Sequence, residues 1–406
     1  MMIAVAWRNV WRNKTRSLVI TIAMSLGLAS GIFYMGFYRG MMDQRIQTAI
    51  ATEASHIQVH HKSYLENPDK KFFITQVDST LDAIRKETGV NAVSSRIILN
   101  TMIQSAATGS GVKITGIVPE NEKLVTNLYT KIAEGSWFKD GKRNPIVIGR
   151  KLADKLKVKL KSKVVITLQD MEGNMTAAAF KVEGIFETSN TAYDENCVFV
   201  QKADLARVMV MEENACHEIA VLLNDNALLD QVNTELIGKF PDLDIKNWRE
   251  VMPEVYLLES SFNLTMFIFI GIILLALLFG IINTMLMAVL ERTKELGMLM
   301  AIGMNKTRVF MMILLETAML ALFGGMWGIL LGWLLNFWFG IQGIDLGAWS
   351  TAYESMGFDT LIYTHLPLSV SLQIAWMVMV TGILAAIYPA IKALKLKPAE
   401  AVRIDM

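Results

Sequence analysis

Long stretches without a formal charge dominate the pattern of hydrophobic and polar positions along this chain. They cover residues 17–38, 260–290, 317–344 and 366–391. A helix rises about 1.5 Å per residue, so about 20 apolar residues cross the hydrocarbon core of a bilayer. Each stretch therefore predicts one membrane-spanning helix, and a purely soluble fold is excluded.

Residues 39–259, between the first two stretches, alternate the signals of strands and helices. The runs HIQVH and PIVIG are typical of strands, and VDSTLDAIRKE and RKLADKL are typical of helices. A further helix is expected at about 122–134, and a hairpin from Val164 to Phe186 turns at MEGN. Polar helical stalks, the second at 251–264, are expected to join this domain to the spans.

The predicted fold is an α-helical membrane protein with four transmembrane helices and a large extracytoplasmic α+β domain, built of two lobes, between helices 1 and 2. Its orientation follows from the positions of Lys and Arg. These residues are concentrated in an amphipathic leader (1–16), in 291–316 and in the tail (392–406), whereas 345–365 has three acids and no Lys or Arg. The first three segments are therefore expected to be cytoplasmic, and 345–365 is expected to be a short periplasmic loop.

Small residues recur at a spacing of four within two of the spans. They are Gly27 and Gly31 in the first span, and Gly324, Gly328 and Gly332 in the third. Such rows let helix backbones approach closely, either within the chain or between subunits. No charged residue lies within an uncharged stretch, so the spans give no support to an ion or proton pathway.

Both cysteines and three clustered histidines lie in the predicted external domain. Cys197 and Cys216 each open an apolar run, so they could form a disulfide between neighbouring strands or remain buried thiols. His56, His60 and His61 lack nearby cysteines or paired acids, which favours a solvated strand end over a metal site. We therefore expect no metal.

Motifs for nucleotide binding and for hydrolysis are missing. No GxxxxGK[ST] loop, GxSxG elbow, HExxH pair or CxxC pair occurs in the sequence. We expect that the chain is not an enzyme, that it binds no cofactor itself, and that nucleic acid is not a partner.

The connection between the second and third spans has an unusual composition. It reads LERTKELGMLMAIGMNKTRVFMMILLE, with a charged turn at 291–295 followed by a methionine-rich apolar face. Gly297 and Gly303 are the expected breaks. An apolar ridge between charged ends suits docking into a groove on a soluble partner, and the alternative is an interfacial helix that only turns the chain.

Several of these phrases resemble one family. ERTKELGMLMAIG, followed by Glu316 and GGMWG, and the ending YPAIKALKLKPAEAVR are similar to the FtsX-like permease module. The entry AWRNVWRNKTRSLVITIAMSLG and the layout of one span, an external domain and three spans resemble it too. Within the family, VKITGIVPENEK and PIVIGRKLADKLKVKLKSKVVITL resemble the lipoprotein-releasing permeases LolC and LolE, whereas the MacB type carries its own ATPase domain.

The resemblance implies an ATP-driven mechanotransmission ABC transporter. Two permeases, identical or paralogous, would sit in the bacterial inner membrane with a dimer of a separate ATPase that holds ATP and Mg. A coupling helix in 291–304 would contact that ATPase. The residues implied in this contact are Glu291, Arg292, Lys294, Glu295, Gly297, Met298, Ala301 and Gly303.

In the lipoprotein-releasing members, cargo would enter from the outer leaflet between the first two spans and pass to a periplasmic carrier. The expected walls, which membrane lipid would also contact, are Met24, Leu28, Phe269, Ile273 and Leu277. One departure from the family is the hairpin ITLQDMEGNMTAAAFKV, which turns too early to form the extended hook of the carrier-binding member.

Two alternative functions remain from the sequence. One is MacB-like efflux of amphiphilic small molecules or peptides. The other is a transmembrane signal transmitter that moves no cargo, as in the cell-division members of the family. The external domain of residues 39–259 is larger than is usual for the signalling members, which counts against that reading.

Overall fold

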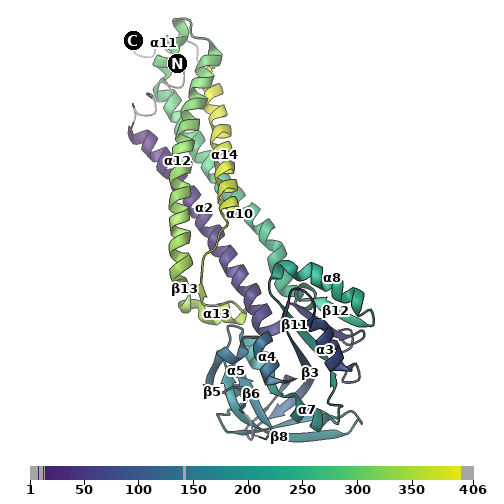
Figure 1. The fold of residues 1–406 in the computed structure, drawn as a ribbon. Coiled ribbons are helices and arrows are strands. Elements are labelled where there is room, and N and C mark those ends of the chain that lie inside the picture. Colours follow the sequence, from purple (N-terminus) through teal and green to yellow (C-terminus); the bar gives the residue numbers. More distant parts are fainter. Residues whose placement is uncertain (1–7, 9–11, 13, 140–142, 395–406) are drawn as a thin grey trace. The chain divides into compact units, whose positions relative to one another are not determined.

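The computed structural model describes residues 8, 12, 14–139 and 143–394 (Figure 1). Most of the expected leader, and the expected tail beyond residue 394, lie outside the described residues. The chain divides into two compact units, which are described in turn. A helical unit contains the chain up to Met42, Ser260–Asp345 and the chain from Leu361, and a second unit contains Asp43–Glu259 with Leu346–Thr360.

Four helices in the described chain are long and apolar enough to cross a membrane. Figure 1 shows them side by side over much of their length, and they share one buried core. They are α2 (Lys14–Thr48), α10 (Pro253–Glu291), α12 (Lys306–Gln342) and α14 (Leu368–Leu394). The first two uncharged stretches lie within α2 and α10, and the other two extend past helix ends at Gly343 and Pro367.

Glycines in α12 bring it into close contact with α2. A Cβ atom added at Gly328 would lie 2.8 Å from Cβ of Leu28, and one added at Gly324 would lie 2.8 Å from Cβ of Met24. A Cβ atom added at Gly332 would likewise lie 2.8 Å from Cβ of Ile32. The glycines of the third span therefore pack against another helix of the same chain, which is one of the two alternatives that the sequence left open.

Shorter elements complete the helical unit. A two-stranded ribbon pairs β13 (Ile344–Asp345) with β14 (Leu361–Ile362), and α11 (Thr293–Ala301) lies between α10 and α12. The segment after β14 contacts α2, because the N–H of His365 donates to the carbonyl of Gly36 at 3.0 Å.

A ten-stranded sheet forms the framework of the second unit. The order is β12-β1-β11-β3-β4-β9-β6-β8-β5, and β7 pairs with β3 and β8. The strands are β1 (Ile57–His61), β3 (Val90–Gln104), β4 (Gly109–Ile117), β5 (Ile132–Gly135), β6 (Pro145–Gly149), β7 (Lys163–Gln169), β8 (Met175–Phe186), β9 (Cys197–Gln201), β11 (Glu218–Leu223) and β12 (Leu243–Asn247). A separate ribbon pairs β2 (Ile74–Thr75) with β10 (Ala215–Cys216).

Short helices pack around this sheet. The α-helices are α3 (Val77–Arg85), α4 (Pro119–Val125), α5 (Arg150–Leu156), α6 (Thr191–Asn196), α7 (Lys202–Met209), α8 (Leu229–Lys239), α9 (Trp248–Val251) and α13 (Ser350–Ser355). The 3₁₀ turns are η2 (Leu128–Lys131), η3 (Asn226–Leu228) and η4 (Gly347–Trp349), and a π-helical turn, η1 (Ala49–Ala54), follows α2.

Two large buried clusters correspond to the two expected lobes. One surrounds β1, β11 and β12 and includes Ile57 and Trp248, and the other surrounds β4, β6, β7 and β8 and includes Ile146 and Phe180. The long strand β3 contributes to both clusters, through Val93 and Ile103. The lobes are therefore two ends of one continuous sheet rather than separate sheets.

The predicted fold class is confirmed, but some local expectations are wrong. The helix expected at 122–134 is divided into α4, η2 and β5. Pro119 opens α4 at the helix start, where its missing N–H costs nothing, and the chain is extended again at Thr126. The hairpin of β7 and β8 turns between Gln169 and Met175, as predicted.

The histidines differ from the expected solvated strand end, and the cysteines follow one of the two alternatives left open by the sequence, that of buried thiols. His56 and His60 are buried, so the predicted solvated strand end is wrong. Cys197 and Cys216 are buried free thiols. They do not lie on neighbouring strands, because Cys197 opens β9 in the main sheet and Cys216 belongs to the separate β2–β10 ribbon.

The contact between α2 and α12 predicts opposite effects for two Gly→Ala changes. Gly328→Ala forces Leu28 and the backbone of Ser25 to move, and we expect a loss of roughly 1–3 kcal/mol of stability. The control is Gly325→Ala, where a Cβ meets no atom within 4 Å. We expect no loss and a gain of up to about 1 kcal/mol from helix propensity. Thermal unfolding in mild detergent measures both, and equal changes would contradict the assigned contact.

Candidate functional site

An apolar groove of about 350 Å³ runs between α2 and α10 in the helical unit. Three of the expected cargo-contacting residues line it, namely Met24, Ile273 and Leu277. The full lining is Val19, Ile20, Ala23, Met24, Gly27, Ser30, Ile273, Ala276, Leu277, Gly280, Ile281 and Thr284. No charged side chain is among these residues.

Several residues that line this groove have small side chains. On α2, Ala23, Gly27 and Ser30 share one face because they are spaced by four and three residues. On α10, Ala276 and Gly280 are spaced by four. A Cβ added at Gly280 would meet no atom within 4 Å, so open space lies in front of this glycine.

Two expected wall residues lie elsewhere. Leu28 is fully buried against Gly328 of α12, because it follows Gly27 by one position and so points about 100° away around the helix. Phe269 packs on Tyr34, with ring centroids 4.6 Å apart, and does not line the groove. The residues expected as walls were all large and apolar, whereas the lining also includes small residues such as Ala276 and Gly280. The spacing of four between these two residues was a signal available in the sequence.

The groove chemistry suits an apolar chain. Its side-chain hydroxyls belong to Ser30 and Thr284. The hydroxyl of Thr284 already donates to the carbonyl of Gly280 at 2.7 Å. An occupant therefore meets a lining that offers mainly dispersion contacts and little hydrogen bonding.

The connection between α10 and α12 folds into a short helix. α10 ends at Glu291, α11 covers Thr293–Ala301, and α12 begins at Lys306. Gly303 breaks the chain as expected, with a φ of 102° that favours glycine. The break expected at Gly297 is wrong, since Gly297 is buried within α11.

Ion pairs hold α11 to its neighbours. The guanidinium of Arg292 donates to Glu316 of α12 at 3.1 Å and to Glu295 at 3.2 Å. Glu295 also forms an ion pair with Arg12. Arg292 and Glu295 therefore act within the chain, and the buried Glu316 is a residue that the site prediction missed although the family resemblance had pointed to it.

The outer face of α11 and the residues just after it are apolar and exposed. Met298 is 58% exposed and Ile302 is 79% exposed, and Ala301 is exposed between them. These positions are spaced by three and four residues, so they form one ridge. Of the remaining predicted contacts, Glu291 and Lys294 are exposed at the start of the loop.

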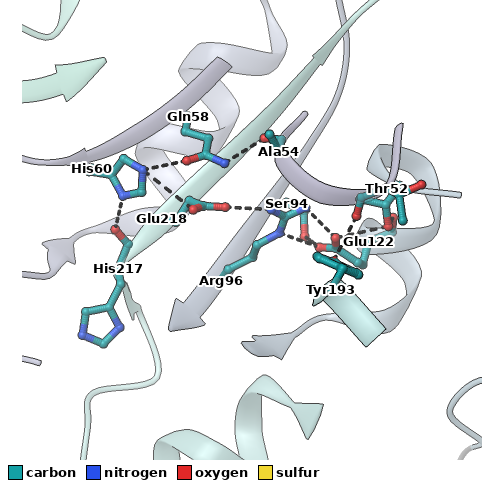
Figure 2. Close-up of polar contacts among 11 residues, drawn as sticks. Thr52, Ala54, Gln58, His60, Ser94, Arg96, Glu122, Tyr193, His217 and Glu218 are labelled. Atoms are coloured by element: carbon teal, nitrogen blue, oxygen red, sulfur yellow. Dashed lines mark hydrogen bonds and ion pairs between the residues drawn. The ribbon is translucent and has the colours of Figure 1, made fainter. Parts of the chain in front are cut away.

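A buried ionic network lies in the second unit (Figure 2). Arg96 on β3 donates to Glu122 at 2.6 Å and to Glu218 at 2.7 Å. Burial by itself lowers the pKa of Arg96, but the carboxylates of Glu122 and Glu218 outweigh it and raise that pKa. Burial raises the pKa of Glu218, and the charge of Arg96 reverses the effect and lowers it.

His60 extends the same network. Its Nε2 lies 3.1 Å from Oε1 of Gln58 and 3.7 Å from Oε2 of Glu218, and its Nδ1 lies 3.1 Å from the carbonyl of His217. No group of three or more His, Cys, Asp or Glu side chains in the described parts of the chain could hold a metal ion. The charges of Arg96, Glu122 and Glu218 are thus paired within the sheet domain, and burial is the main cause that lowers the pKa of the adjoining His60.

Four helices that could cross a membrane and a large α/β domain between the first two make up the architecture of the described chain. The FtsX-like permease C-terminal model matches residues 267–398, and the MacB-like periplasmic core domain model matches residues 17–239. The chain belongs to the FtsX/MacB-type family of ABC transporter permeases. The two models that match this chain describe a permease module and a periplasmic core domain.

Relatives extend over most of the chain. The LolE transmembrane protein of the lipoprotein-releasing system of Haemophilus influenzae is 22% identical over 77% of this chain and 77% of the relative. The LolC protein of Neisseria meningitidis is 22% identical over 89% of this chain and 88% of the relative. The macrolide export ATP-binding/permease protein MacB of Rhodopirellula baltica is 30% identical over 50% of this chain and 27% of that longer protein.

Pairing of Arg292 with Glu316 predicts non-additive effects on stability. Arg292→Met removes a positive charge that is paired with the buried carboxylate of Glu316, so we expect a loss of about 3–5 kcal/mol of stability. Adding Glu316→Leu should restore most of the lost stability, because both charges are then removed. Thermal unfolding of the single and double variants measures the coupling, and additive losses would contradict the pairing.

Proposed function

We propose that this chain is the permease subunit of an ATP-driven ABC transporter that extracts lipoproteins from the outer leaflet of a bacterial inner membrane. The observation that carries the proposal is the groove between α2 and α10, which is open, apolar and uncharged along its lining. An acyl chain is the part of a lipoprotein that such a lining favours. The relatives LolE and LolC, which align over most of their length, support this cargo class.

The proposed orientation follows the distribution of Lys and Arg. Both termini and α11 are cytoplasmic, and the Asp43–Glu259 domain is periplasmic. In this orientation α11 is available to a cytoplasmic partner. The groove residues of α2 lie within 19–30, from the cytoplasmic end of the first uncharged stretch to its middle, so an acyl chain that enters from the outer leaflet reaches the groove at the middle of the bilayer.

The proposed partners are a cytoplasmic ATPase dimer and a second permease, either another copy or a paralogue. ATP and Mg bind to the ATPase, and this chain holds neither. The ridge of Met298, Ala301 and Ile302 contacts a groove on the ATPase. A periplasmic carrier that receives the cargo completes the assembly, although the turn after Gln169 leaves no extended hook.

Movement of the ATPase reaches the rest of the chain through α11. The ion pair of Arg292 with Glu316 carries displacement of α11 to α12, and the glycine contacts carry it from α12 to α2. Since α2 also forms one wall of the groove, the same displacement changes the space that is open to cargo.

Efflux of amphiphilic small molecules or peptides is the second candidate function. The MacB-like core domain and the MacB relative favour it, and an apolar groove would also accept such molecules. A signal transmitter without cargo is the third reading, and it gives no role to the groove.

Filling the groove tests the cargo proposal. Gly280→Leu places a side chain in the open space in front of Gly280. We expect release of a triacylated lipoprotein from proteoliposomes, driven by ATP and the cognate ATPase, to fall at least tenfold, with basal ATPase activity within twofold of wild type.

The matched control is Gly271→Leu on the same helix, where a Cβ also meets no atom within 4 Å and which does not line the groove. Release should remain near wild type in this variant. If Gly280→Leu releases lipoprotein normally but loses export of an amphiphilic dye, the efflux function is favoured. Normal activity with both cargoes would contradict the groove assignment.

Docking of the ATPase is tested at the exposed ridge. Met298→Glu places a charge at the contact, and we expect at least a tenfold loss of ATPase recovered with the tagged chain. Met356→Glu is the control, because Met356 is also an exposed methionine, at 70%, but lies outside α11. Equal recovery of ATPase by both variants would contradict the assignment of the docking ridge.

A further inference from the structure

The helix α2 ends in an uncommon way. After Thr48 it continues as a π-helical turn, Ala49–Ala54, and the N–H of Ser55 donates to the carbonyl of Ile50 at 2.9 Å. Ser55 then adopts a φ of 65°, which is unusual for a residue other than glycine. Such π-helical turns are rare and are frequently found at functional sites.

Three of the carbonyls at this helix end accept hydrogen bonds from other parts of the second unit. The carbonyl of Ala54 accepts from Nε2 of Gln58 at 2.9 Å. That of Thr52 accepts from the hydroxyl of Tyr193 at 3.1 Å, and that of Ala51 accepts from the N–H of Asn127 at 2.9 Å. The last carbonyls of a helix normally lack a helical partner, so these bonds replace the missing ones.

Glu53 adds a charged attachment on the same turn. Its Oε1 accepts from Arg45 of α2 at 3.1 Å and from Nδ2 of Asn190, which caps α6, at 3.0 Å. The side chains of Arg45 and Glu53 are mostly buried. The turn is thus bonded both to the helix before it and to α6.

The buried ionic network closes a ring of contacts around this turn (Figure 2). From Ala54 the contacts run through Gln58 and His60 to Glu218, and from there through Arg96 to Glu122.

From Glu122 the ring returns to the turn. The hydroxyl of Thr126 donates to Glu122 at 3.3 Å, and the next residue, Asn127, contacts both Ala51 and Thr52. A closed ring of short contacts resists displacement better than a single bond, because moving one member strains the others.

The attachments to this turn differ in which lobe they reach. Gln58 lies on β1, four residues after Ala54, so it belongs to the lobe that follows the turn in sequence. Tyr193 instead packs against Phe186 and Phe199 in the aromatic cluster between β6, β8 and β9. Its hydroxyl therefore ties the turn to the distant lobe.

We propose that the Ala49–Ala54 turn is the joint at which displacement of α2 is delivered to the whole sheet, and that Tyr193 is the positioning residue that engages the distant lobe. The proposal rests on the proposed function, in which α2 moves with the ATPase cycle. The bond of Asn190 to Glu53 is a second attachment of the turn to α6, so loss of the Tyr193 bond weakens the coupling to the distant lobe without removing it.

The chemistry of Tyr193 suits a permanent attachment. Burial is the main cause that raises the pKa of its hydroxyl, so the group stays protonated and able to donate at every physiological pH. Replacement by phenylalanine removes the donor and keeps the ring in its aromatic cluster. Tyr193→Phe is therefore a specific change at the joint.

The experiment compares wild type, Tyr193→Phe and the control Tyr129→Phe, whose ring is exposed on η2, in the full chain reconstituted with its ATPase. It measures the ATP hydrolysed per lipoprotein released, with thermal unfolding in parallel. For Tyr193→Phe we expect ATPase activity within twofold of wild type and at least fivefold more ATP consumed per cargo released. The control should match wild type.

Two outcomes overturn the proposal while leaving the proposed function intact. One is an unchanged ratio of ATP to cargo in Tyr193→Phe. The other is a parallel loss of ATPase activity, release and thermal stability, which indicates a merely structural role. A wild-type chain that neither stimulates the ATPase nor releases lipoprotein contradicts the proposed function itself, and this inference fails with it.

Discussion

The close contact between α2 and α12 is the constraint on which the helical unit depends. Gly324, Gly328 and Gly332 let α12 lie against Met24, Leu28 and Ile32 without intervening side chains. In a bilayer, where lipid competes equally well for apolar surface, such close backbone packing is a main source of helix association. A Cβ atom added at Gly27 would lie 3.0 Å from Leu277, and one added at Gly31 would lie 3.3 Å from Ile273, so α10 also packs closely on α2. The open space of the groove lies in front of Gly280.

The sheet unit depends on charge rather than on small residues. Arg96, Glu122 and Glu218 are all buried, and each would be costly without its partners. Their pairing joins β3, β11 and α4 near the end of α2. Buried ion pairs are weak evidence for stability, but they restrict geometry, since only one arrangement satisfies all the charges. Such a restriction suits the proposed function, in which the sheet domain keeps its geometry while α2 is displaced.

The helix α2 is attached to other elements both near its start and after its end. Near its start, α11 is bonded to α12 through Arg292 and Glu316, and α12 packs on α2. After its end, the Ala49–Ala54 turn is bonded to β1, α6 and the segment before η2. A continuous helix of 35 residues connects these attachments. The transmission of movement in the proposed function follows this helix.

By itself, the sequence determined the four spans, the external α/β domain, the β7–β8 hairpin and the break at Gly303, because charge, periodicity and glycine act over a few neighbouring residues. It could not determine which side of a helix faces a groove: Leu28 was expected there, yet it is buried against Gly328, and the open space lies in front of Gly280. Nor could it show that His60 is buried, that the lobes share β3, or that Tyr193 meets Thr52 across 141 positions. These features are decided by packing between segments distant in sequence, where the energy of a contact depends on partners that no local pattern encodes.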